Sequence, residues 1–188
     1  MLLLSLLCGC GNSINAAIPL ATQTEVPPYH RSEFPHWSDL QPPWGCDTRS
    51  EILQRDVDSQ GEQVVSKNRR GCVVKVYIVD PYTEATTDDV DVDHIVALED
   101  AWYSGAYAWT REERERFAND PGELLAVSAS ANRAKGSHGP DAWQPPNIEF
   151  WCTYGTLYRD IKAQWHLTIS SPQEVGITAL LRACTNPT

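Results

Sequence analysis

A histidine flanked by carboxylates closes an apolar alternation at residues 91–100, which read DVDHIVALED. Regular strand geometry places neighbouring side chains on opposite faces, so Asp93 and His94 can serve one site only if the strand ends or bends there. A histidine in this setting, taken alone, is more often structural or solvated than catalytic. The catalytic interpretation of His94 gains support from NRAKG (132–136), which begins 38 residues after His94 and adds an amide and two cations. Two oxygen ligands and one imidazole are enough for metal-assisted proton transfer.

A short strand and a short helix would have to position these groups. Residues 72–80 (CVVKVYIVD) are rich in β-branched side chains, and residues 89–94 alternate with a period of two. This pattern predicts two strands paired as a hairpin. Residues 128–136 (SASANRAKG) begin with serines able to cap a short helix, which would end at Gly136.

Further helices are predicted from capping signals and from apolar steps of three and four residues. They cover residues 46–56 with Asp47 or Thr48 as cap, a segment opened by a capping box at 110–113, an amphipathic segment after Asn147, and a segment opened by a capping box at 171–174. Strands and helices of this kind predict one domain of the α+β class.

The chain resembles the HNH endonucleases, which have a ββα-metal fold, in the pair formed by DHIV and NRAKG. It is most similar to the branch found in the C-terminal domain of GmrSD-type restriction enzymes and in many secreted bacterial proteins. Further fragments fall in the order of that family over residues 29–184: YHRSEFPHW, CDTR, DPYT, DHIVALEDAWYSGA, FANDP, LLAVSASANRAKG and WQPP.

The resemblance implies a role for each group in the hydrolysis of phosphodiesters. Asp93 and Asn132 would hold Mg²⁺ or Mn²⁺, which oxygen-only ligation favours over Zn²⁺. His94 would be the general base that activates water. Arg133 and Lys135 would face phosphates. The fold implied is a ββα-metal, HNH-like core with flanking α-helices, stapled by disulfides.

Three other positions are candidates for the site. Glu123 occupies the place where the family usually has an Asn that holds the loop of the base by hydrogen bonds. Because an ionised Glu accepts such bonds but cannot donate them, loop rigidity and activity are in question. His138 is interpreted as an exposed loop residue, with a contact to phosphate or to a second ion as the alternative. Arg49 is interpreted as a phosphate contact or an internal ion-pair partner.

Composition and the N-terminus bear on location. The 188 residues carry a formal charge of −10, so nucleic-acid binding would need a local basic patch or a metal ion.

Residues 1–10 resemble a secretory leader that ends in a bacterial lipoprotein box, with Cys10 as the lipidated residue. A proline-rich tether over residues 11–28 and a nuclease domain over residues 29–188 would follow. We expect an extracellular or cell-surface bacterial protein.

Four cysteines fall in the predicted domain: Cys46, Cys72, Cys152 and Cys184. In an exported chain they indicate two disulfides, for which three connectivities exist. The order along the chain favours Cys46 with Cys72 and Cys152 with Cys184. A zinc site of four thiolates is the alternative, but the domain contains no CxxC pair.

These features predict an exported, monomeric, metal-dependent endonuclease that acts on DNA, or on RNA, without sequence specificity. Membrane contact would occur only through the lipid anchor. Two alternatives remain: a catalytically weak or inactive relative that binds nucleic acid or metal, and a lipid-anchored surface protein whose Asp-rich strand binds Ca²⁺.

Overall fold

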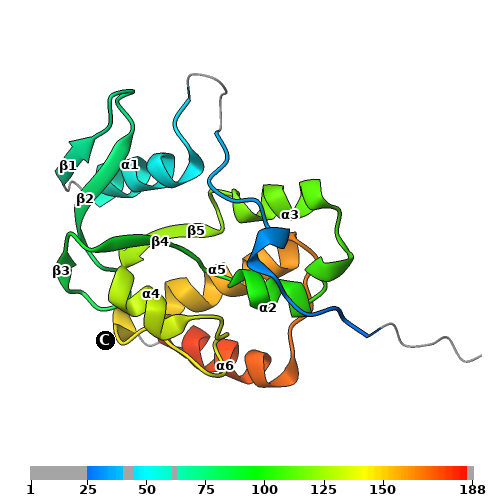
Figure 1. The fold of residues 1–188 in the computed structure, drawn as a ribbon. Helices are drawn as coiled ribbons and strands as arrows, with labels where there is room; N and C mark the ends of the chain where they lie inside the picture. Colours follow the sequence, from blue (N-terminus) through cyan, green and yellow to red (C-terminus); the bar gives the residue numbers. More distant parts are fainter. Residues whose placement is uncertain (1–24, 40–44, 61–62, 186–188) are drawn as a thin grey trace, which may run out of the picture.

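The computed structural model describes residues 25–39, 45–60 and 63–185 (Figure 1). The predicted leader (1–10), its Cys10 and most of the predicted tether (11–28) lie outside these residues. The elements in chain order are η1 (Arg31–Glu33), α1 (Thr48–Gln60), β1 (Gln63–Lys67), β2 (Val73–Val79), β3 (Thr86–Thr87), β4 (Val90–His94), α2 (Leu98–Tyr103), η2 (Ala106–Ala108), α3 (Arg111–Ala118), β5 (Leu124–Ser128), α4 (Ala129–Lys135), η3 (Ile148–Phe150), α5 (Trp151–Gln164), α6 (Ser171–Leu181) and η4 (Arg182–Cys184). The α+β class is confirmed.

The strands form two small antiparallel sheets, β1-β2-β3 and β4-β5. In β4 and β5, Asp91 lies opposite Val127, Asp93 opposite Leu125 and His94 opposite Leu124. The predicted hairpin between residues 72–80 and 89–94 is wrong, because β2 pairs with β1 and β3 while β4 pairs with β5. A period of two identifies a strand but does not specify its partner.

Helix α1 covers one face of both sheets. Its apolar side chains join those of β2, β4 and β5 in one hydrophobic core: Ile52, Leu53, Val57, Val73, Val76, Ile78, Val90, Val92, Leu124 and Ala126. Asp47 caps α1 as predicted, since its Oδ1 accepts a hydrogen bond from the Ser50 N–H at 2.7 Å. This core holds β4 and β5 in place through the apolar side chains on one face of the strands.

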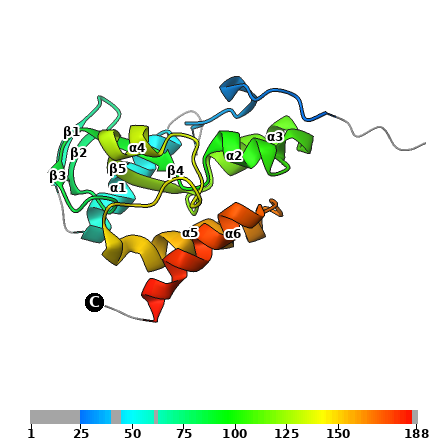
Figure 2. The same cartoon turned by 90° about the horizontal axis from the view of Figure 1, so that it is seen from below.

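The remaining helices build a second core around large aromatic side chains, including Phe34, Phe117, Tyr154 and Tyr158. Figure 2 shows α5 and α6 as a layer on one side of α2 and α3, with the segment before α1 on the other side. The capping box of α3 is confirmed at Thr110 and Glu113. In α6 the box uses Ser170 and Gln173, one residue before the predicted pair, because both SxxQ and SxxE fit here.

Both favoured disulfides are confirmed. Cys46 is bonded to Cys72, which joins the segment before α1 to the segment before β2. Cys152 is bonded to Cys184, which joins α5 to η4, directly after α6. Packing on the domain already starts at Pro27, whose carbonyl accepts a hydrogen bond from the Trp102 indole at 2.7 Å. Within the described part of the chain, no helix is long and apolar enough to cross a bilayer.

Candidate active site

A small pocket of about 80 Å³ lies where β4 ends against α4. Because His94 is the last residue of β4, the strand ends where the alternation would otherwise separate Asp93 from His94. Asp93, His94 and Asn132, which the sequence predicted as one site, all line this pocket, together with Arg31, Val92, Ala97, Leu98 and Gly136. The Ser128 cap and the C-cap Gly136, with a φ of 54°, confine α4 to the predicted residues.

His94 is held in one tautomer. Its Nε2 lies 2.9 Å from the carbonyl oxygen of Ala118, which can only accept a hydrogen bond, so Nε2 carries the proton and Nδ1 keeps a free lone pair. Burial lowers the pKa of His94 to about 3; the Ala118 hydrogen bond opposes this effect, and the charge of Arg31 adds to it. The side chain is 5% exposed. At neutral pH the imidazole is therefore uncharged, as a general base must be.

Asp93 is buried at the base of the same pocket. Its Oδ1 accepts a hydrogen bond from Lys135 Nζ at 2.9 Å, and its Oδ2 accepts one from the Tyr82 hydroxyl at 2.7 Å. Lys135 Nζ also donates to the His94 carbonyl at 2.7 Å. Burial raises the pKa of Asp93, and both partners oppose this effect.

The prediction that Lys135 faces phosphates is wrong. Its side chain is fully buried and forms an ion pair with Asp93. An isolated ammonium would be too costly to bury, so Lys135 requires a carboxylate partner at this depth. Its ammonium therefore anchors the strand end instead of binding substrate.

Asn132 and Asp91 lie side by side at the rim. Asn132 Nδ2 donates to Asp91 Oδ2 at 3.2 Å, which brings α4 against β4. Arg133, on the same helix, is exposed and lies 3.9 Å from Asp89. An ion pair between two largely exposed side chains is weak, so Arg133 remains free to bind an anion.

The donor set at this strand end fits a hard divalent cation. No three His, Cys, Asp or Glu side chains of the described residues gather as metal ligands. However, Mg²⁺ is commonly held by one or two protein oxygens and keeps several waters. Asp93 and Asn132 share the pocket, and Asp91 contacts Asn132. Each Asp93 oxygen accepts one hydrogen bond and has a second lone pair. Oxygen ligands of this kind favour Mg²⁺ or Mn²⁺.

Glu123 holds the loop that follows His94. Its Oε1 accepts a hydrogen bond from the Val96 N–H at 3.0 Å, and its backbone carbonyl accepts one from the Ile95 N–H at 2.9 Å. Glu123 thus accepts hydrogen bonds from this loop, as expected for an acceptor at this position. The other oxygen, Oε2, is buried without a hydrogen-bond partner. Burial raises the pKa of Glu123 well above 4.5, although Lys135 opposes this effect.

The stability of the protein should therefore depend on the protonation of Glu123. A carboxyl whose folded-state pKa is raised stabilises the fold fully below its unfolded pKa, and this contribution is lost as the pH rises toward the folded pKa. Relative to the Glu123→Gln variant, the free energy of unfolding of the wild type should fall above about pH 4.5, by at most about 1.4 kcal/mol per pH unit. Urea unfolding of both proteins between pH 4 and 8 measures this difference. A constant difference across that range would mean that Glu123 is ionised in the folded protein.

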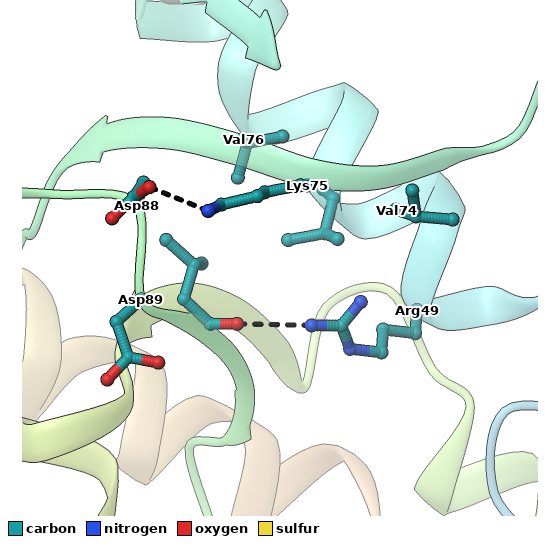
Figure 3. A pocket seen from close by; sticks show the side chains of 8 residues that line it. Arg49, Val74, Lys75, Val76, Asp88 and Asp89 are labelled. Atoms are coloured by element: carbon teal, nitrogen blue, oxygen red, sulfur yellow. Dashed lines mark hydrogen bonds and ion pairs between the residues drawn. The ribbon is translucent and has the colours of Figure 1, made fainter. Parts of the chain in front are cut away.

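The other two candidates lie outside the small pocket. His138 is exposed and lines a separate pocket with Glu99 and Asp141. Arg49 lines a pocket of about 290 Å³ between α1, β2 and the start of β4 (Figure 3). Its Nη2 donates to the Val90 carbonyl at 3.1 Å. Among the described residues Arg49 thus forms no ion pair and binds the backbone where β4 begins, and a phosphate contact of Arg49 stays a prediction.

Residues 25–39, here called the N-terminal strap, cover the histidine. The Trp37 ring lies 5.7 Å from the His94 ring, and the His36 ring lies 6.3 Å from it. Trp37 has a φ of 61°, which is strained for a bulky residue and persists only where the surroundings enforce it. The strap also brings Arg31 to the pocket.

Sequence reasoning missed several residues of this site: Arg31, His36, Trp37, Tyr82 and Asp91. Asp91 could have been found, because residues two apart in a strand share a face, and Asp91 precedes Asp93 by two. The others lie in YHRSEFPHW and DPYT, two fragments that fall in the order of the family, but the resemblance assigned no role to these residues.

The described chain is an α+β protein in which two antiparallel strands and the helix after them share one pocket. It belongs to the family described as GmrSD restriction endonucleases, C-terminal domain, whose model matches residues 47–173. An uncharacterized secreted protein of Arthroderma benhamiae is 36% identical over 158 residues, which cover 83% of this chain and 76% of that relative. No solved structure matches the chain.

Proposed function

We propose that this protein is an exported, metal-dependent endonuclease that hydrolyses phosphodiester bonds. The observation that supports this function best is the shared pocket of Asp93, His94 and Asn132. Membership of a restriction-endonuclease domain family supports nucleic acid as the substrate. The similarity to a secreted protein supports export.

In the proposed reaction, His94 Nδ1 accepts a proton from a water molecule that attacks the phosphorus atom. The bond from phosphorus to the leaving oxygen breaks, and solvent water supplies the proton that this oxygen takes up. The hydrogen bond to Ala118 keeps the proton on Nε2 and so keeps Nδ1 available. Only a water molecule has to reach the imidazole, which is compatible with a side chain that is 5% exposed. Arg133, at the rim, would bind the phosphate of the strand.

Asp93 and Asn132, with Asp91 beside Asn132, would hold Mg²⁺ or Mn²⁺. When bound, the ion would neutralise charge on the phosphate and on the leaving oxygen. The buried pair of Asp93 and Lys135 keeps the ligand carboxylate fixed at the strand end.

Cleavage of plasmid DNA tests the proposed function. The purified protein should convert supercoiled plasmid to nicked and linear forms in Mg²⁺ or Mn²⁺, and EDTA should stop the reaction. DNA is the favoured substrate and RNA the second, and we expect cleavage without sequence preference. Failure to cut DNA or RNA with either ion, by a protein that is folded, would contradict the proposal.

A weakly active relative that binds nucleic acid is the second candidate. The small pocket and the nearly complete burial of His94 favour it over a fast enzyme. It predicts that a labelled oligonucleotide binds the protein in Mg²⁺ without being cut. Binding of Ca²⁺ at the Asp-rich strand would instead raise the melting temperature without any effect of DNA.

Removal of Asn132 should weaken metal binding independently of activity. Saturating Mg²⁺ or Mn²⁺ should stabilise the wild type by about 1–3 kcal/mol, as for any ligand that binds only the folded state. The Asn132→Ala variant should lose most of this stabilisation, because it lacks the amide oxygen. Thermal unfolding with and without the ion measures the effect.

Two further variants control this measurement. Asn132→Asp keeps an oxygen ligand and should keep the response, and Ser137→Ala, an exposed site just beyond α4, should respond like the wild type. An equal response from Asn132→Ala would place the ion elsewhere.

A further inference from the structure

Arg31 lies on the N-terminal strap and lines the same pocket as Asp93, His94 and Asn132. The strap lies outside residues 47–173, over which the family model matches. One cation of the site is therefore supplied by a segment outside the matched residues.

The other two cations near the site each have a carboxylate within ion-pair distance. Lys135 is buried against Asp93, and Arg133 lies near Asp89. No carboxylate of the described residues lies within ion-pair distance of Arg31, whose side chain faces solvent. Arg31 is thus the pocket cation whose charge is least compensated.

The neighbour of Arg31 helps to orient its guanidinium. His36 Nδ1 lies 2.8 Å from the carbonyl oxygen of Phe34, so it carries the proton and Nε2 is the accepting nitrogen. Arg31 Nη2 lies 3.5 Å from that Nε2, at the limit of a hydrogen bond. The Tyr29 hydroxyl is a second hydrogen-bonding neighbour of Arg31. A guanidinium has five N–H donors in a planar arrangement, which suits two oxygens of one phosphate.

The strap backbone is fixed on both sides of Arg31. Before it, the Pro27 carbonyl accepts a hydrogen bond from Trp102. After it, Arg114 donates to the Glu33 carbonyl at 2.9 Å, and Phe34 is fully buried in the second core. In Figure 1 this segment runs along α2 and continues toward α3. An arginine on an anchored backbone loses less freedom when it binds a phosphate than one on a free tail.

We propose that Arg31 binds a phosphate of the nucleic-acid strand at this site, so that the strap completes the substrate-binding surface. The inference rests on the proposed function. It supplies the phosphate contact that buried Lys135 does not make, and it makes Arg31 a binding residue of the site, whereas His94 and Asp93 belong to the cleavage step.

Binding of a labelled duplex of about 20 base pairs, in Mg²⁺ and between about 50 and 200 mM salt, tests the role of Arg31. A His94→Asn background prevents cleavage, and fluorescence anisotropy reports affinity. The Arg31→Ala change should weaken binding about tenfold, since one charge-assisted contact is lost. The slope of log K against log salt should fall in magnitude by about one. Arg31→Lys should recover part of the affinity, because it restores the charge without the planar fork.

Arg111→Ala is the matched control, because it removes an exposed arginine at the first position of α3, outside the pocket. It should leave the affinity unchanged, and thermal melts confirm that each variant is folded. If the parent binds and Arg31→Ala binds equally well with the same salt slope, the role of Arg31 is overturned while the proposed function stands. If the wild type neither cleaves nor binds nucleic acid, both proposals fail together.

Discussion

The His94→Ala variant should lose plasmid cleavage by a factor of about 10²–10⁴, the usual contribution of a general base. The structure gives the reason: the Ala118 carbonyl fixes the proton on Nε2, which leaves Nδ1 as the nitrogen that accepts a proton. The nearby His36 imidazole instead directs Nδ1 at the Phe34 carbonyl and Nε2 at Arg31. Initial rates of plasmid nicking in saturating Mg²⁺ or Mn²⁺ measure the loss.

Two controls separate chemistry from folding in this experiment. His138→Ala removes an exposed histidine from a different pocket and should keep the wild-type rate. His94→Asn keeps a polar side chain in the buried position, and its melting temperature shows whether the fold survives. A cleavage rate within a few-fold of the wild type in a folded His94→Ala protein would exclude His94 as the base.

The Asp93→Ala variant should lose about 3–5 kcal/mol of the free energy of unfolding, because it leaves the buried ammonium of Lys135 without a counter-charge. The Tyr82 hydroxyl also loses its acceptor. Urea unfolding at neutral pH measures the loss. This variant would also be inactive, but its stability is the more informative measurement.

A double variant and an exposed pair serve as controls for this loss. Replacing both partners, Asp93→Leu with Lys135→Met, should recover most of the stability, since apolar groups of similar volume replace a buried ion pair at little cost. Asp89→Ala breaks the exposed pair with Arg133 and should cost no more than about 0.5 kcal/mol. If Asp93→Ala matched Asp89→Ala, the ammonium of Lys135 would have to reach water.

The parts of the fold that local patterns determine could be predicted from the sequence. The caps at Asp47 and Thr110 depend on side chains that bond backbone groups three residues away, so a short window contains the information. The order of the cysteines along the chain favoured the observed disulfide pairing among three possible ones. The strand pairing could not be predicted, because β4 meets β5 across an insertion that holds α2 and α3.

Some residues of the candidate site could likewise be predicted from the sequence, and others depend on long-range packing. Asp93, His94 and Asn132 were grouped by resemblance, and the structure places them around one pocket. The burial of Lys135 depends on Asp93, which is 42 residues away, so its position on a helix end suggested solvent instead. Arg31 and Trp37 reach the histidine only because Phe34 anchors the strap in the core, a long-range effect that no periodicity shows.

The internal ammonium of Lys135 has a consequence for how the chain acquires its structure. In the apoprotein, the carboxylates of a metal centre repel one another. Many small metalloproteins therefore cannot fold until the ion binds. Here the acid at the strand end is neutralised by a group of the same chain. We therefore expect maturation to proceed without a supply of divalent ions, and chelators to leave the architecture intact.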